Sequence, residues 1–159
     1  MEAFSTVTGS ALLASLDSHI AVDPAQLQAL FRRGTAYAMQ GRYKQAQQVF
    51  TLLIVHDMSN PHYHLALGAS FQGQNRFSEA IMAYGMAWAQ EPGDELPLFF
   101  MGEALVQQGK ESDARVVLHL FLRKSEERCR YGEQRTRARR LLMGARERRL
   151  GDKENVNGK

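Results

Sequence analysis

A repeat of 34 residues runs through the middle of the chain and restricts what it can fold into. Glycines recur at this spacing at Gly34, Gly68 and Gly102. An alanine follows each glycine by 12 residues, at Ala46, Ala80 and Ala114. A fixed period of this length is typical of arrays in which each unit is a pair of helices that cannot bury its apolar side alone. The sequence therefore predicts helical pairs stacked into a short superhelix with a concave inner wall.

Large side chains and turn residues keep the same register as the glycines. Sixteen residues after each glycine stand Phe50, Tyr84 and Leu118, and three residues after it stand Tyr37, Phe71 and Leu105. The turn between the two helices of each pair falls at residues that tolerate a left-handed backbone: Gly41, Asn75 and Gly109. This pattern is that of the tetratricopeptide repeat. We predict an all-α fold of three such repeats, over residues 27–60, 61–94 and 95–128.

Capping residues agree with these boundaries. Asp23 and Asn60 each stand directly before a proline, which places a capping side chain ahead of a proline at the first helical position. Asp94 is the candidate cap of the third repeat, where Pro97 still lies in the first turn.

The segment before the repeats, residues 1–26, contains a candidate amphipathic helix. Its apolar side chains fall on one helical stripe, formed by Leu12, Leu13, Leu16 and Ile20. A solenoid needs its ends covered, so the stripe fits a cap on the first repeat, and it fits a dimerisation helix equally well. The sequence leaves both open.

The carboxyl end differs from the rest of the chain in charge. Residues 1–122 carry seven basic and eleven acidic side chains, whereas residues 123–159 carry thirteen basic and six acidic ones. We predict a basic amphipathic helix over residues 129–150 and a disordered tail over 151–159. The helix is interpreted first as a solubilising cap on the third repeat, while contact with nucleic acid, an anionic membrane surface or an acidic partner stays open.

Signatures of catalysis and metal binding are missing from the sequence. There is no G-x-S-x-G elbow, no phosphate-binding glycine loop and no paired-cysteine motif. His62 and His64 are two residues apart, which points them to different faces of a helix, and Cys129 has no orienting base nearby in sequence. We therefore expect no enzyme activity, metal or cofactor. A single cysteine, no secretory signal and no apolar run long enough to span a bilayer fit a reducing cytoplasm.

The concave wall is the candidate functional surface, because the first helix of each repeat lines it in this architecture. The second, fifth, ninth and twelfth residues of each repeat give its lining: Gln28, Phe31, Thr35, Ala38, His62, Leu65, Ala69, Gln72, Leu96, Phe99, Glu103 and Val106. Phe31, Leu65 and Phe99 hold the same position in successive repeats and are expected to form an apolar row. Such a wall suits an extended peptide, although the same side chains could instead pack between repeats.

Three stretches carry a more specific resemblance. GRYKQAQQVFTLLIVHD, ALGASFQGQNRFSEAIMAYGMAWAQEP and GEALVQQGKESDA resemble the tetratricopeptide class II chaperones of bacterial type III secretion systems, over about residues 27–122. The resemblance implies a non-enzymatic cytoplasmic chaperone. It would bind hydrophobic translocator proteins through the groove and keep them soluble for export.

The resemblance also implies roles for particular residues. Family members bind an extended translocator segment in pockets matched here by Phe31, Tyr43, Leu65 and Phe99, and many dimerise through the amino-terminal helix, here Leu12, Leu16 and Ile20. Some also assist a transcriptional activator. The chain departs from the family at Thr35 and Ala38, where aromatic residues are common, and in its arginine-rich carboxyl end. The alternatives are a regulatory scaffold for a transcription factor and a nucleic-acid binder acting through the basic helix.

Overall fold

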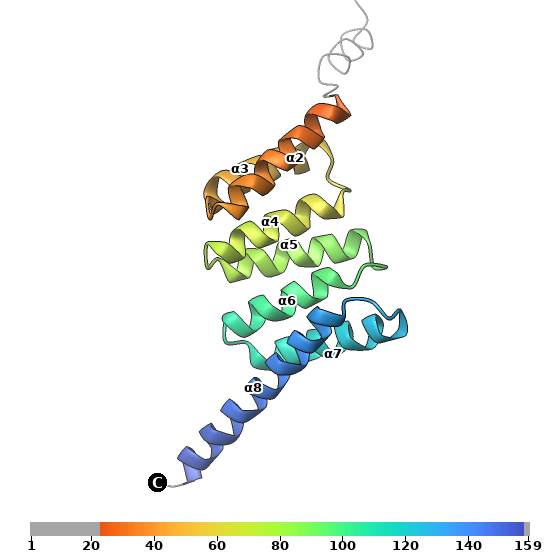
Figure 1. The fold of residues 1–159 in the computed structure, drawn as a ribbon. Helices are drawn as coiled ribbons and strands as arrows, with labels where there is room; N and C mark the ends of the chain where they lie inside the picture. The colour runs from red at the N-terminus through yellow and green to blue at the C-terminus, as the bar shows by residue number, and fades with distance from the viewer. Residues whose placement is uncertain (1–22, 158–159) are drawn as a thin grey trace, which may run out of the picture.

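Seven helices form the described part of the chain. The structure is a computed structural model that describes residues 23–157 of the 159, with side chains as far as residue 144. The helices are α2 (Pro24–Met39), α3 (Tyr43–His56), α4 (Pro61–Gly73), α5 (Phe77–Gln90), α6 (Leu96–Gln107), α7 (Glu111–Glu127) and α8 (Gly132–Asn157). The first six form three stacked pairs, and α8 crosses the last pair and projects beyond it (Figure 1). The predicted all-α repeat fold is confirmed.

Polar caps begin the first helix of each pair, as the sequence predicts. Asp23 accepts a hydrogen bond from the amide of Ala25, and Asn60 accepts one from the amide of His62, both at 3.1 Å. The Asp94 carboxylate accepts one from the first helical amide of α6, also at 3.1 Å. These side chains satisfy amides that have no partner within the helix.

The glycines of the 34-residue period lie where the two helices of each pair pack closely together. A methyl group at Gly34 would lie 2.7 Å from the Phe50 ring, and one at Gly68 would lie 2.6 Å from the Tyr84 ring. Each ring belongs to the second helix of the same pair and is 1% exposed. The large side chain sixteen residues after each glycine therefore fills the space that the missing side chain leaves.

Left-handed residues join the two helices of each pair. The φ angle is +73° at Gly41, +59° at Asn75 and +80° at Gly109. Glycine adopts this conformation without steric cost, and asparagine tolerates it better than other residues with side chains.

This conformation leads to a first prediction, at the turn of the second repeat. Asn75→Ala should lower the free energy of unfolding by about 1 kcal/mol, because alanine lacks the polar group that eases the left-handed backbone. Asn75→Gly should leave it unchanged or raise it slightly. Chemical denaturation of the three proteins checks both changes, and equal stability of the alanine and glycine variants would contradict the argument.

Contacts between repeats show which helices lie on the inner side of the stack. The first helices touch each other, α2 with α4 and α4 with α6. Among the described residues, the second helices α3, α5 and α7 have no contacts with one another. Successive repeats therefore lie closer together along their first helices than along their second helices. We define the solvent-facing side of α2, α4 and α6 as the inner face.

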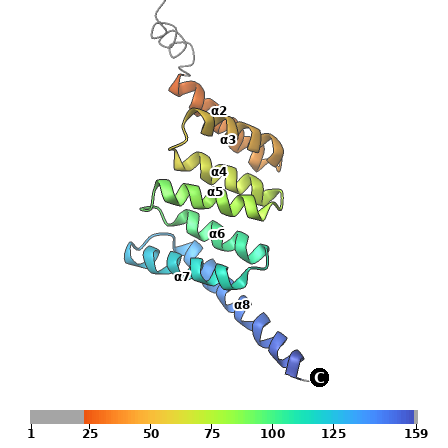
Figure 2. The same ribbon diagram turned by 180° about the vertical axis from the view of Figure 1, so that it is seen from behind.

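The carboxyl end is held to the third pair by polar contacts. The Tyr131 hydroxyl donates to Asp94, and Arg128 pairs with Glu95 at 3.2 Å. Beyond these contacts α8 runs to Asn157, through the tail that we expected to be disordered (Figure 2). Once a helix is nucleated, each further residue adds a hydrogen bond at modest entropic cost, which explains the extension.

Candidate binding face

The predicted lining residues differ widely in exposure. Gln28, Thr35, His62 and Ala69 are exposed, whereas Phe99 and Glu103 are buried. The others are half-buried: Phe31, Ala38, Tyr43, Leu65, Gln72, Leu96 and Val106. The inner face is consequently most open along α2 and α4.

Two half-buried apolar side chains form the floor of this open part. The Phe31 ring lies 5.7 Å, between ring centroids, from both Phe50 and Tyr63. Leu65 packs against the cluster that contains Ala80 and Tyr84. Each side chain thus joins two helices, so the packing role that the sequence left open is observed. The part of each side chain that stays in solvent is the candidate surface for a peptide.

Phe99 does not belong to this open surface. It is 2% exposed, and its ring centroid lies 5.3 Å from Phe100 and 5.5 Å from Phe121. The aromatic side chains of α6 and α7 enclose it in the core of the third pair. The expected row of three apolar side chains along the wall is reduced to Phe31 and Leu65.

Tyr43 packs between the first two repeats. Its ring would lie 2.5 Å from a methyl group built on Gly73, the last residue of α4. The tyrosine therefore occupies the space left by that glycine at the edge of the inner face.

A chain of hydrogen bonds orders the polar side chains between α4 and α6. The Tyr84 hydroxyl donates to the Gln72 side-chain oxygen, and the Gln72 amide donates to Gln107, each at 2.7 Å. Burial raises the pKa of Tyr84, and the negative charge of Glu103 raises it further, which keeps the hydroxyl a donor. Gln72 and Gln107 are thus oriented hydrogen-bonding groups beside the apolar floor, as an extended backbone requires.

A buried acid on the inner side of α6 pairs with α8. The side chain of Glu103 is 7% exposed, and its Oε1 atom lies 2.5 Å from Nε of Arg137 on α8. Burial raises the pKa of Glu103, and the arginine opposes that shift without cancelling it.

This raised pKa predicts a pH dependence of stability. The folded chain holds a proton on Glu103 more readily than the unfolded chain does, so stability falls as pH rises from the unfolded pKa through the folded one. Glu103→Gln should remove this loss, so the free energy of unfolding of the variant, relative to that of wild type, should be higher at pH 7 than at pH 4. Denaturation of both proteins between pH 4 and 8 checks the sign, and a variant that loses stability most at neutral pH would contradict it.

Some residues of the inner face were not predicted from the sequence. Met39 is 84% exposed and stands four residues after Thr35, which places it on the same side of α2. Gln107 was missed as well, although it follows Val106 directly. The signal for Met39 was its helical spacing from the predicted lining.

One predicted feature lies outside the residues that the structure describes. The stripe of Leu12, Leu13, Leu16 and Ile20 falls in the part that the structure does not describe. Among the side chains of residues 23–144, no group of histidine, cysteine and acidic residues is arranged to hold a metal. None of the described helices combines the length and apolarity needed to cross a bilayer.

Helical pairs, glycine–aromatic packing and left-handed turns together define a tetratricopeptide-repeat fold. A family model for the tetratricopeptide repeat matches residues 28–56. The chaperone SicA of Salmonella typhimurium is 29% identical over 98 residues, which cover 62% of this chain and 59% of that protein. The chain thus matches about three-fifths of the length of this curated relative.

Solved structures share the fold. The type III secretion translocator chaperone SycD of Yersinia enterocolitica superposes with a TM-score of 0.76 at 23% identity, covering 81% of this chain and 98% of SycD. PcrH in complex with the chaperone binding region of PopD superposes with a TM-score of 0.76 at 20% identity, covering 81% of this chain and 97% of PcrH. These comparisons confirm the resemblance to type III secretion chaperones that the sequence indicates.

Proposed function

We propose that this chain is a non-enzymatic chaperone of a type III secretion system that binds hydrophobic translocator proteins in the bacterial cytoplasm. The main support is the shared fold, since SycD has been solved with a peptide of the translocator YopD and PcrH with the chaperone binding region of PopD. An extended translocator segment would lie along the inner face of α2, α4 and α6.

The chemistry of the inner face supports this ligand. Phe31 and Leu65 provide half-buried apolar floors, exposed Thr35 and Ala69 leave room above them, and Gln72 offers an oriented amide. Each ligand side chain buried on such a floor contributes about 1.5 to 3 kcal/mol before the cost of ordering the peptide. Three such anchors reach the roughly 8 kcal/mol of micromolar binding only near the top of this range, so hydrogen bonds along the face have to supply part of an affinity that holds a translocator and still releases it.

A protein that later enters a membrane exposes apolar segments beforehand, and these aggregate unless they are covered. Co-expression with the translocators of the same secretion system tests whether the chain covers them. The proposal predicts that a translocator stays in the soluble fraction only when the chain is present and co-purifies with it in 0.5 M salt. Recovery of only a transcription factor or nucleic acid would instead favour a regulatory or nucleic-acid-binding role.

We also propose that the amino-terminal stripe of Leu12, Leu13, Leu16 and Ile20 supports a homodimer. SycD has been solved as an alternative dimer, which motivates the suggestion. Light scattering of the full chain and of a Leu16→Asp variant tests it, because an unchanged mass would remove this role.

A further inference from the structure

The repeat register continues into α8. Extending the 34-residue period past residue 128 aligns Glu133, Arg137 and Arg140 with Phe99, Glu103 and Val106. Ala138 then aligns with Ala104, and both are 0% exposed. α8 therefore presents its residues in the same rotation as the first helix of a repeat.

The packing of α8 agrees with this register. It contacts both α6 and α7, as α4 contacts both α2 and α3. Thr136, which aligns with Gly102, is exposed because no described second helix packs against it. α8 thus takes the place of a fourth first helix, and the inner face continues from α6 onto it.

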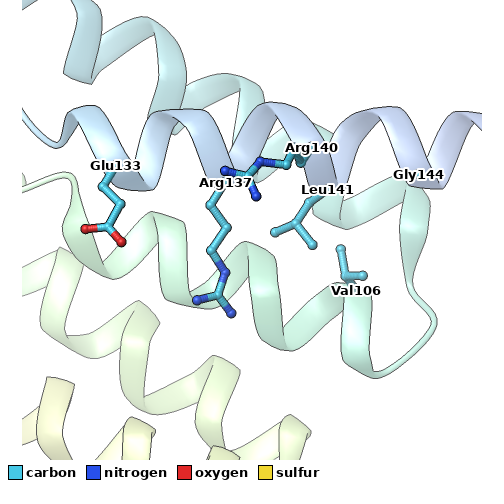
Figure 3. A pocket seen from close by; sticks show the side chains of 6 residues that line it. All are labelled: Val106, Glu133, Arg137, Arg140, Leu141 and Gly144. Atoms are coloured by element: carbon cyan, nitrogen blue, oxygen red, sulfur yellow. The ribbon is translucent and has the colours of Figure 1, made fainter.

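A pocket marks this continuation. Its volume is about 540 Å³, and its lining consists of Val106 on α6 with Glu133, Arg137, Arg140, Leu141 and Gly144 on α8. Val106 and Leu141 face each other across the gap between the two helices, and Arg137 reaches from α8 toward α6 (Figure 3). The pocket therefore has an apolar part flanked by arginine side chains.

The charges of the pocket are not equally available. Arg137 is engaged by Glu103, whereas Arg140 has no ion pair within the part of the chain that the structure describes. Glu133 lies in the first turn of α8, two helical turns or roughly 10 Å from Arg140 along the axis. The available positive charge of the pocket is thus that of Arg140, the residue directly before Leu141 in the chain.

We propose that the binding face ends in this pocket and that the bound segment places an acidic residue against Arg140, next to an apolar residue between Val106 and Leu141. Arginine pairs with a carboxylate through two parallel hydrogen bonds, which suits it to this recognition. The net charge of +7 over residues 123–159 steers an acidic segment to the same end. The inference rests on the proposed function and adds a specificity determinant to it.

The test uses the full chain and overlapping 20-residue peptides that tile the translocators of the same secretion system. A bound peptide with an acidic residue is titrated into wild type, Arg140→Glu and Arg123→Glu, followed by fluorescence anisotropy. Arg123 is exposed on α7 and outside the pocket, so it is the control for net charge. Arg140→Glu should weaken binding by about fivefold or more, and changing the acidic residue of the peptide to arginine should restore it.

Other outcomes overturn the inference. If Arg140→Glu binds as wild type does while Ala69→Arg does not bind, the face carries the proposed function but ends before α8. An equal loss of peptide affinity in Arg123→Glu would show a general charge effect. If Arg140→Glu instead loses affinity only for a labelled oligonucleotide titrated in parallel, α8 is a nucleic-acid contact and not the end of the peptide-binding face. If wild type binds no tile at all, the proposed function fails, and this inference fails with it.

Discussion

Gly68→Ala should destabilise the folded chain strongly, although it adds only one methyl group. The new methyl would lie 2.6 Å from the Tyr84 ring, which is 1% exposed and hydrogen-bonded to Gln72, so the ring has no free space to enter. Overpacking of this kind costs about 1 to 3 kcal/mol and outweighs the gain of up to about 1 kcal/mol from the better helix former. Thermal and urea denaturation measure the loss.

Gly85→Ala is the matched control for this substitution. Gly85 also lies within a helix, but a methyl there would meet only the Met101 side-chain end at 3.7 Å, an ordinary contact. This variant should gain up to about 1 kcal/mol from helix propensity. Opposite signs for the two glycines support the packing role of the repeat, and equal signs would contradict it.

Ala69→Arg, at the neighbouring residue, should abolish ligand binding without unfolding the chain. Ala69 is exposed in the middle of the inner face, so an arginine projects into solvent and changes stability by less than about 0.5 kcal/mol. The same side chain would occupy the space above Leu65 that an apolar anchor of the ligand needs. Binding should weaken by at least about 30-fold, as expected for loss of a central anchor. Titration with a bound translocator peptide measures the loss.

Ala89→Arg is the control for Ala69→Arg. Ala89 is an exposed alanine of α5, a second helix, and so it lies outside the inner face. The two variants have the same composition and net charge. Binding that drops equally in both would assign the effect to charge rather than to obstruction of the inner face.

Ala69 is a better test position than Phe31 because the Phe31 side chain also holds the repeats together. Its ring packs against Phe50 and Tyr63, so Phe31→Asp would place a carboxylate among aromatic side chains. Such a change lowers stability together with affinity. A loss of binding in that variant would therefore not separate a lost anchor from a lost fold.

The sequence predicted the repeat fold because its determinants are local and periodic. The glycine at Gly68 and the ring at Tyr84 form one spatial unit at a constant separation, and Asn60 and Asn75 mark a helix start and a turn by their own chemistry. These features can be recognised from residue types and their spacing, without the three-dimensional structure.

The exposure of the candidate site could not be predicted in the same way. Position in the repeat places Phe99 on the inner side of α6, but its burial depends on Phe121 and on how α7 and α8 close around it. The part played by α8 was missed because it lacks the signature glycine, with Thr136 in its place, and its pocket residues are charged where those of the repeats are mostly apolar. Burial is a property of the assembled helices, which the spacing alone does not contain.

The most direct test of the account is the affinity of the full chain for translocator peptides in 0.5 M salt, with wild type and Ala69→Arg side by side. An apolar binding face predicts micromolar binding by wild type that high salt leaves largely unchanged, and loss of that binding in Ala69→Arg. Binding that survives the arginine, or that disappears from wild type in 0.5 M salt, would contradict the assignment of the inner face as the translocator site.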